Sequence, residues 1–276
     1  MRIDAHQHFW TYDPINYSWL GEGMESIRRT FMPEDLWPVL QRNNIDGSVL
    51  IQVNQAELEN TAFLNHAAEH DFIKGVVGWI DFKAANLEER LHFYKQPSKS
   101  KMKGFRHIVQ GEPDDFLLDK AFTSGVKKLR DFGFTYDILI FERQIKAALE
   151  FVRNLPDNKL VIDHIAKPDI ANKSIRKWSN YMAAIARHEN VFVKVSGMVT
   201  ETTYYEWEKE DFYIYLDYIL NTFGPKRIMY GSDWPVCLVS ANYEEQLDIV
   251  QTYFSRLTQT EQNDIFGGNA SRFYSL

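Results

Sequence analysis

The stretch that decides the fold lies near the N-terminus and reads Asp4-Ala5-His6-Gln7-His8-Phe9-Trp10. We predict that residues 3–8 form a short strand, in which side chains two residues apart share a face. His6 and His8 then point the same way, with Asp4 below them. Two neutral imidazoles side by side are suited to bind a divalent metal, to relay a proton or to polarise an oxygen. Matching chemistry follows near the far end of the chain, in Gly231-Ser232-Asp233-Trp234-Pro235.

Working outward from this stretch, short apolar segments alternate with amphipathic ones along the whole chain. The predicted strands are residues 3–8, 48–53, 75–80, 104–108, 135–140, 160–165, 191–196 and 228–232. Most are nearly continuous apolar runs, which is typical of parallel strands covered on both sides. The predicted helices are residues 33–43, 60–70, 87–94, 116–132, 144–154, 174–188, 211–223 and 243–257. Eightfold alternation predicts an α/β fold, either a (β/α)₈ TIM-type barrel or a doubly wound sheet. No Gly-x-Gly-x-x-Gly follows any strand, which disfavours the nucleotide-binding sheet.

Length and composition are consistent with one enzyme-sized domain. The 276 residues fit a single barrel over residues 1–276, since such barrels have about 250 residues. The net charge is −7 and no basic stripe occurs, so neither nucleic acid nor an anionic membrane is an expected partner. No apolar run approaches the roughly 18 residues of a membrane span. The single cysteine, Cys237, has no internal disulfide partner, and the N-terminus does not read as a signal peptide. We expect a cytoplasmic protein and leave its oligomeric state open.

In a parallel barrel the catalytic groups lie at the C-terminal ends of the strands. In this sequence, ionisable and polar residues gather at that end of nearly every predicted strand. They are His6, His8, Gln52, Asn54, Asp81, Arg106, His107, Tyr136, Asp137, Asp163, His164, Lys194 and Asp233. This gathering predicts an enzyme.

Five motifs resemble the amidohydrolase superfamily, and more closely its amidohydrolase-related lactonase branch. They are residues 4–10, 103–107, 163–168, 194–197 and 231–237. The resemblance covers the whole chain in the expected order. It implies a (β/α)₈ barrel that hydrolyses a 1,5- or 1,4-lactone of a sugar acid in carbohydrate catabolism.

The same resemblance bears on the cofactor. Metal-dependent relatives usually carry a bridging lysine or glutamate on the fourth strand, or a metal-binding histidine on the fifth. Here residues 134–140 contain no histidine, and Lys103 lies at the start of the fourth strand. We therefore predict at most one divalent ion, zinc before others, on His6, His8 and Asp233, with or without His164. Lactonases of this branch that need no metal are known, so the ion could be dispensable and the histidines could act as hydrogen-bond donors.

Asp233 and His164 are the predicted acid–base residues. Asp233 would take a proton from water, bind the metal, or do both. Its structural alternative is to cap a helix that begins near Pro235. His164 would polarise the lactone carbonyl or assist the leaving hydroxyl, while Asp163 would face the other way in a regular strand. A satisfied core histidine is the alternative for His164.

Arg106 and His107 are neighbours, so a regular strand turns only one of them inward. By resemblance Arg106 is the inward one, and its planar fork suits a developing oxyanion. His107 is a weaker candidate, for substrate binding.

Several further residues are candidates for contact with the sugar. Gln52, Tyr136 and Asp137 could bind sugar hydroxyls, or could serve as buried polar anchors. Trp10 opens an aromatic first loop, residues 10–19, whose rings could stack on a sugar or pack on the barrel. The aromatic segment 201–207 could form the opposite wall.

The predicted function is therefore a hydrolase that opens an aldonolactone, such as L-fucono-lactone, to the aldonic acid. A metal-dependent decarboxylase of an aromatic or dienoic acid is the rival, disfavoured because the fifth strand lacks a histidine. A non-catalytic sugar-binding barrel is a third interpretation, against which the set of ionisable strand ends speaks.

Overall fold

A ring of eight parallel strands forms the centre of the molecule. The computed structural model describes residues 1–276, and the strands are hydrogen-bonded in chain order. They are β1 (Ile3–Gln7), β2 (Gly47–Ile51), β3 (Ile73–Gly78), β4 (Met102–Ile108), β5 (Thr135–Leu139), β6 (Leu160–Ile162), β7 (Val191–Val195) and β8 (Ile228–Tyr230). Nearly all strand positions are buried, as parallel strands covered on both faces require. The predicted (β/α)₈ barrel is confirmed.

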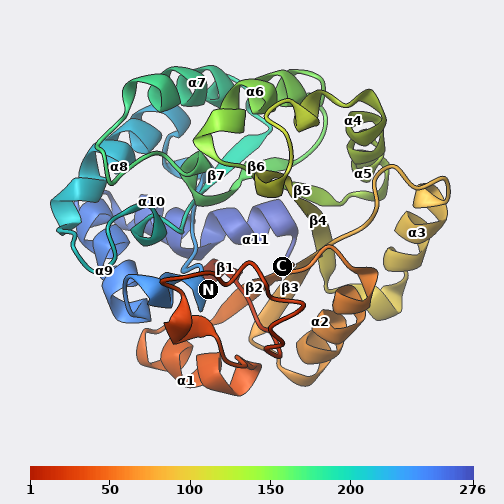
Figure 1. Ribbon diagram of the computed structural model, residues 1–276, viewed down its shortest axis with the longest axis horizontal. Coiled ribbons are helices and arrows are strands. Elements are labelled where there is room, and N and C mark those ends of the chain that lie inside the picture. The colour runs from red at the N-terminus through yellow and green to blue at the C-terminus, as the bar shows by residue number, and fades with distance from the viewer.

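Most of the helices surround this ring (Figure 1). The helices are α1 (Pro33–Arg42), α2 (Glu57–Glu69), α3 (Leu87–Tyr94), α4 (Lys120–Lys127), α5 (Leu129–Phe132), α6 (Ile145–Arg153), α7 (Arg176–Ala186), α8 (Lys209–Phe223), α9 (Tyr243–Phe254), α10 (Gln259–Asn263) and α11 (Asn269–Tyr274). Helix α6 shows the pattern that covers a barrel: Ile145, Ala148 and Val152 are buried on one face, because residues three and four apart lie on the same side of a helix.

The single helix predicted over residues 116–132 is wrong. The segment forms a 3₁₀ turn (Phe116–Leu118), then α4, then α5. Asp119 causes the break, because its extended backbone places the carboxylate where it accepts hydrogen bonds from Ala121 N and Phe122 N. A side chain that caps a helix in this way starts a new one.

The barrel closes where the end of β8 meets β1. Trp234 O accepts a hydrogen bond from His8 N at 2.7 Å, and Asp233 N donates to His6 O at 2.8 Å. Backbone pairing therefore joins the two motifs that lie furthest apart in the sequence.

Two apolar layers flank the strands. The outer layer fills the space between strands and helices, and the inner layer fills the barrel. Helix α11, which no sequence pattern predicted, crosses the centre of the ring in Figure 1 and buries Phe273 and Tyr274 in the inner layer. Lys103, at the start of β4, donates to Ser275 O at 2.8 Å. The helix therefore closes the end of the barrel opposite the C-terminal ends of the strands.

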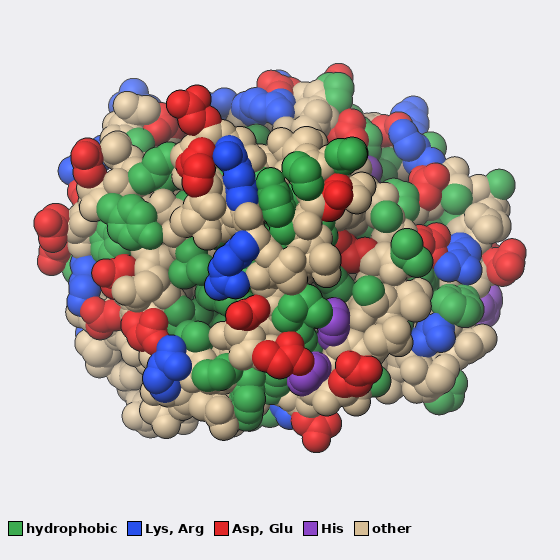
Figure 2. Space-filling view, turned by 60° about the horizontal axis from the view of Figure 1, so that its bottom comes forward, with side chains coloured by type: hydrophobic (Ala, Val, Ile, Leu, Met, Phe, Trp, Pro, Cys, Tyr) green, Lys and Arg blue, Asp and Glu red, His purple; other side chains and the backbone are tan.

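None of the helices combines the length and apolar character needed to span a bilayer. Figure 2 shows acidic and basic side chains interspersed over one face of the molecule, without a patch of a single sign.

Candidate active site

The two histidines of the first motif both point into the barrel. His6 Nε2 and His8 Nε2 lie 3.2 Å apart, as predicted from their spacing. The pairing of β1 with β2 shifts register between Asp4 and Gln7, so the alternation of faces is interrupted there. As a result, the neighbours Ala5 and His6 both face the inside of the barrel, where Ala5 joins the inner apolar layer.

Asp4 does not lie below the histidines, and that expectation is wrong. Because of the register shift, its carboxylate faces the outer layer. Asp4 Oδ1 accepts a hydrogen bond from Ser232 N at 2.8 Å, and Oδ2 accepts one from the Tyr243 hydroxyl at 3.2 Å. Asp4 thus fixes the turn that carries Asp233.

Asp233 reaches the histidines from the end of β8. Its Oδ1 lies 3.4 Å from His8 Nε2 and 3.8 Å from His6 Nε2. The residue has a φ of 59°, a left-handed conformation that aspartate and asparagine tolerate better than most residues. Its side chain does not cap the following turn, Val236–Val239. Burial alone would raise the pKa of Asp233, but His164 and His8 outweigh it and hold the pKa below its usual value.

The sixth strand is shorter than the predicted 160–165, because β6 ends at Ile162. The next turn holds four consecutive left-handed residues, with φ of 54°, 47°, 61° and 45° from His164 to Lys167. Such a conformation costs about 1–2 kcal/mol per residue, so the rest of the structure must impose it. Its effect is to direct Asp163 and His164 toward His6 together, and the expectation that Asp163 faces outward is wrong.

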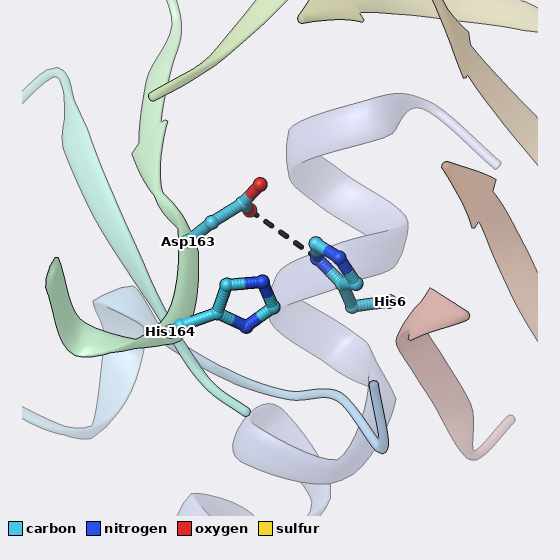
Figure 3. A group of neighbouring side chains, drawn as sticks. All are labelled: His6, Asp163 and His164. Atoms are coloured by element: carbon cyan, nitrogen blue, oxygen red, sulfur yellow. Dashed lines mark ion pairs between the residues drawn. The ribbon is translucent and has the colours of Figure 1, made fainter. Parts of the chain in front are cut away.

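Figure 3 shows the Asp163 and His164 side chains, from one segment, both pointing toward His6. Asp163 Oδ1 lies 3.3 Å from His6 Nδ1, and the His164 ring is 4.4 Å from the His6 ring. His164 Nδ1 lies 2.9 Å from the Ser196 hydroxyl, and its Nε2 lies 3.9 Å from Asp233 Oδ1. Burial holds the pKa of His164 well below its usual value, against the opposing charge of Asp233. This imidazole is therefore neutral at physiological pH.

Arg106 faces the interior, as the resemblance implied. Its NH1 donates to Asp163 Oδ2 at 3.0 Å and lies 3.3 Å from His6 Nε2. Its Nε donates to Gln52 Oε1 at 2.9 Å, and its NH2 donates to the Gln52 carbonyl. Gln52 thus holds the guanidinium in place, and little of the fork remains for a ligand.

His107 faces away from Arg106, as alternation requires. Its Nε2 lies 3.1 Å from Glu112 Oε1, and its Nδ1 accepts from Trp79 Nε1 at 3.3 Å. The ring stacks on Phe116. His107 belongs to the packing of the outer loops, so the structure does not support its predicted contact with substrate.

The sequence as a whole agrees with this geometry. The amidohydrolase family model matches residues 3–276. The chain belongs to the amidohydrolase family. Over 291 aligned residues it is 35% identical to L-fucono-1,5-lactonase of Burkholderia multivorans, an alignment that covers 100% of this chain and 96% of that protein. The L-fucono-1,5-lactonase of Burkholderia ambifaria is 30% identical over 287 residues, with 100% and 96% covered. A crystal structure of an amidohydrolase from Burkholderia multivorans with bound Zn has a TM-score of 0.95 at 36% identity, covering 100% of this chain and 99% of that one.

Two predicted substrate contacts of this amidohydrolase lie outside the site. Tyr136 alternates with Asp137 on β5, so its ring enters the outer layer and packs against Phe122 and Phe151. Trp10 is buried, and its indole N–H donates to Arg29 O at 2.8 Å. Both residues pack on the barrel, which was the alternative for Trp10.

Asp137 faces inward but lies beneath the site rather than at its opening. Asp137 Oδ2 accepts hydrogen bonds from Lys194 Nζ at 2.6 Å and from the Tyr274 hydroxyl at 2.8 Å. All three residues are buried, so Asp137 supports the site and cannot touch a substrate. From the sequence, Lys194 is a candidate for contact with sugar hydroxyls, with a packed lysine stem as the equal alternative. The structure instead makes it part of the buried support of the site, and the signal for that role is its inward position on β7, across β6 from the inward Asp137 of β5.

One group of atoms in this amidohydrolase fits a metal ion. His6 Nε2, His8 Nε2 and Asp233 Oδ1 are buried and separated by 3.2, 3.4 and 3.8 Å. Ligand atoms bound tetrahedrally to zinc at about 2.0–2.1 Å lie roughly 3.3 Å from one another. His8 Nδ1 faces the Ile51 carbonyl at 2.8 Å and His6 Nδ1 faces Asp163. A proton on His8 Nδ1, donated to that carbonyl, leaves the His8 Nε2 lone pair free, which is the usual arrangement of metal-binding histidines. His6 Nδ1 also has Lys194 Nζ at 3.3 Å.

Proposed function

We propose that this amidohydrolase hydrolyses a sugar-acid lactone, in particular an aldonolactone such as L-fucono-1,5-lactone, to the aldonic acid. The observation that carries the proposal is the convergence of Asp233, His164 and the two β1 histidines at the catalytic end of the barrel. The full-length identity of 35% to a protein named L-fucono-1,5-lactonase supports the choice of substrate class.

Asp233 supplies the base. Its pKa lies below the usual value, so the carboxylate is ionised at neutral pH and can accept a proton from water. The water oxygen attacks the lactone carbonyl carbon, and the bond from that carbon to the ring oxygen then breaks. The ring oxygen takes up the proton and leaves as a hydroxyl group of the aldonic acid.

His164 supplies the electrophile, and Arg106 supports it through its charge. Ser196 can donate its hydroxyl proton to His164 Nδ1, which leaves an N–H on Nε2, on the side of Asp233. A neutral imidazole N–H polarises a carbonyl oxygen and stabilises the oxyanion that forms. Arg106 adds a fixed positive charge, since its NH1 lies 3.3 Å from His6 Nε2.

We infer a single ion, zinc before others, on His6, His8 and Asp233, supported by the zinc in the similar Burkholderia multivorans structure. When bound, such an ion polarises the carbonyl and lowers the pKa of water. His6 and His8 keep the role of holding it, each fixed through its Nδ1.

A panel of aldonolactones and non-sugar lactones tests the proposal, with acid release followed by a pH indicator and corrected for spontaneous opening. We expect turnover of sugar lactones and none of aromatic or dicarboxylate lactones. Acid release from the second group alone would contradict the substrate class. No release from any lactone, or release of carbon dioxide from an aromatic acid, would contradict the lactonase assignment itself.

A further inference from the structure

Lys194 is a charged side chain with no access to solvent. It lies on β7, and its side chain is 0% exposed. Its Nζ lies 2.6 Å from Asp137 Oδ2, 3.0 Å from Asp163 Oδ1 and 3.3 Å from His6 Nδ1. The Tyr274 ring closes the remaining side, with its centroid 5.4 Å from Nζ. A buried ammonium is tolerated only where carboxylates surround it, so this position is built for a cation.

The Lys194 ammonium also lies against a second group of potential metal ligands. His6, Asp163 and His164 offer ligand atoms that all lie within 4.8 Å of one another. Lys194 Nζ contacts two of these three residues, at the atoms Asp163 Oδ1 and His6 Nδ1. Asp163 Oδ1 meets both neighbours at ion-pair distance but without hydrogen-bond geometry, and Asp137 Oδ1 also lacks a partner. Buried carboxylate oxygens with spare lone pairs are the ligands that a divalent cation would take.

The lower position, beneath His6 and around Lys194 Nζ, already has balanced charges. Asp137 and Asp163 face Lys194, and Asp163 also pairs with Arg106. Two carboxylates and two cations leave no net charge to attract a further ion. Above His6, by contrast, the Asp233 carboxylate meets only histidines, so the unbalanced negative charge lies where the first ion would bind.

We propose that the Lys194 ammonium occupies the place of a second metal ion and thereby limits this amidohydrolase to one divalent ion. Lys194 is a positioning residue, because it holds Asp163 against His6 Nδ1. It thereby directs His6 Nε2 toward the ion proposed on His6, His8 and Asp233. The inference rests on the one-metal site proposed above, but it does not depend on which lactone is hydrolysed.

Zinc counting on metal-free protein tests this proposal. The wild type, Lys194→Met and the control Lys167→Met are titrated with zinc, dialysed and measured by elemental analysis. Lys167 pairs with Glu201 at 2.5 Å above the site, so its loss removes a nearby lysine without opening the lower position. The variant Lys194→Gln also removes the positive charge and can still donate to Asp137 Oδ2, should Lys194→Met not fold.

We expect one ion per chain in the wild type and in Lys167→Met, and two in the Lys194 variants. Adding Asp163→Asn to a Lys194 variant should remove the second ion, which places it at the lower position. Two ions in the wild type would overturn the proposal. So would a folded Lys194 variant that binds no more zinc than the wild type, whatever the number. These counts stay the same if the sugar-lactone assignment alone fails, because they do not depend on turnover.

Discussion

Asp233 is the residue at which a catalytic role can be separated from a structural one. We predict that Asp233→Asn lowers kcat by at least about 10²-fold, within the range that general acid–base catalysis contributes, because an amide cannot take a proton from water. Asparagine tolerates the left-handed backbone at this position, so the melting temperature should be unchanged or slightly higher. Steady-state kinetics on a lactone substrate and a thermal melt check the two parts. Near-normal turnover in a folded variant would make Asp233 structural.

Arg106 is tested by a change that keeps its charge. We predict that Arg106→Lys lowers kcat/KM by about 10²-fold, comparable to the loss of one oxyanion donor. A lysine cannot hold both oxygens of Gln52 together with Asp163 Oδ2, so the geometry around His6 should loosen as well. Initial rates over a substrate range measure this. A change within about twofold would show that the guanidinium fork is not needed.

Glu59 of α2, near the site, makes the stability of the folded state depend on pH. Its carboxylate accepts hydrogen bonds from Val53 N and Asn54 N. Burial nevertheless raises its pKa to about 7, more than these bonds and Arg106 lower it. The folded state therefore retains this proton better than the unfolded chain. The resulting stability is complete below about pH 4.5 and is lost as the pH rises through about 7.

We predict that Glu59→Gln matches the wild-type melting temperature at pH 5 and exceeds it at pH 8, because glutamine keeps an acceptor oxygen and has no proton to lose. Thermal melts at the two pH values provide the comparison. Equal melting temperatures at both would show that the Glu59 carboxyl titrates at its ordinary value.

Side-chain direction was predictable where strands are regular and not elsewhere. Alternation separates Arg106 from His107 correctly, and it would also have turned Tyr136 outward once Asp137 was taken as inward. It fails for Asp4, where β1 shifts register, and for Asp163, where a left-handed turn replaces the end of β6. Both departures depend on contacts across the barrel that no local pattern encodes.

At the scale of elements, the strands and outer helices were predicted because each shows its own periodicity. Helix α11 was missed because its six residues, Asn269–Tyr274, are too few to show one. Its place is set by the open end of the barrel, whose inner layer needs a cover. Asp119 likewise divides the predicted helix 116–132, because it caps the start of α4, without a change in periodicity.

The importance of α11 can be measured through Phe273, which is 3% exposed and packs against Phe192. We predict that Phe273→Ala lowers the free energy of unfolding by about 3–5 kcal/mol, the usual cost of emptying a buried phenylalanine site. The control is Phe141→Ala on an outer loop, where the ring is 39% exposed and the expected cost is within about 0.5 kcal/mol. Urea unfolding of both variants checks this. Similar costs for the two would mean that α11 does not support the barrel.

At the scale of the whole molecule, the ends of the chain complete the structure. The end of β8 pairs with β1 through His8 N and Trp234 O, and α11 fills the barrel from below. Neither the ring nor the inner layer is complete until the last residues are in place. Local opening of one strand would therefore expose apolar surface shared with the others.

We predict that residues 1–276 unfold as one cooperative domain. The 7 tryptophans are spread from the first loop to the end of β8, so their fluorescence reports on the tertiary structure around the whole ring. Far-UV circular dichroism reports on the helices. In a urea titration the two signals should change together, with one midpoint. Saturating zinc should raise that midpoint without splitting the transition, because an ion that binds only the folded state stabilises all of it. Two separate midpoints in the metal-free protein would contradict the single domain, and would show that part of the barrel folds without the rest.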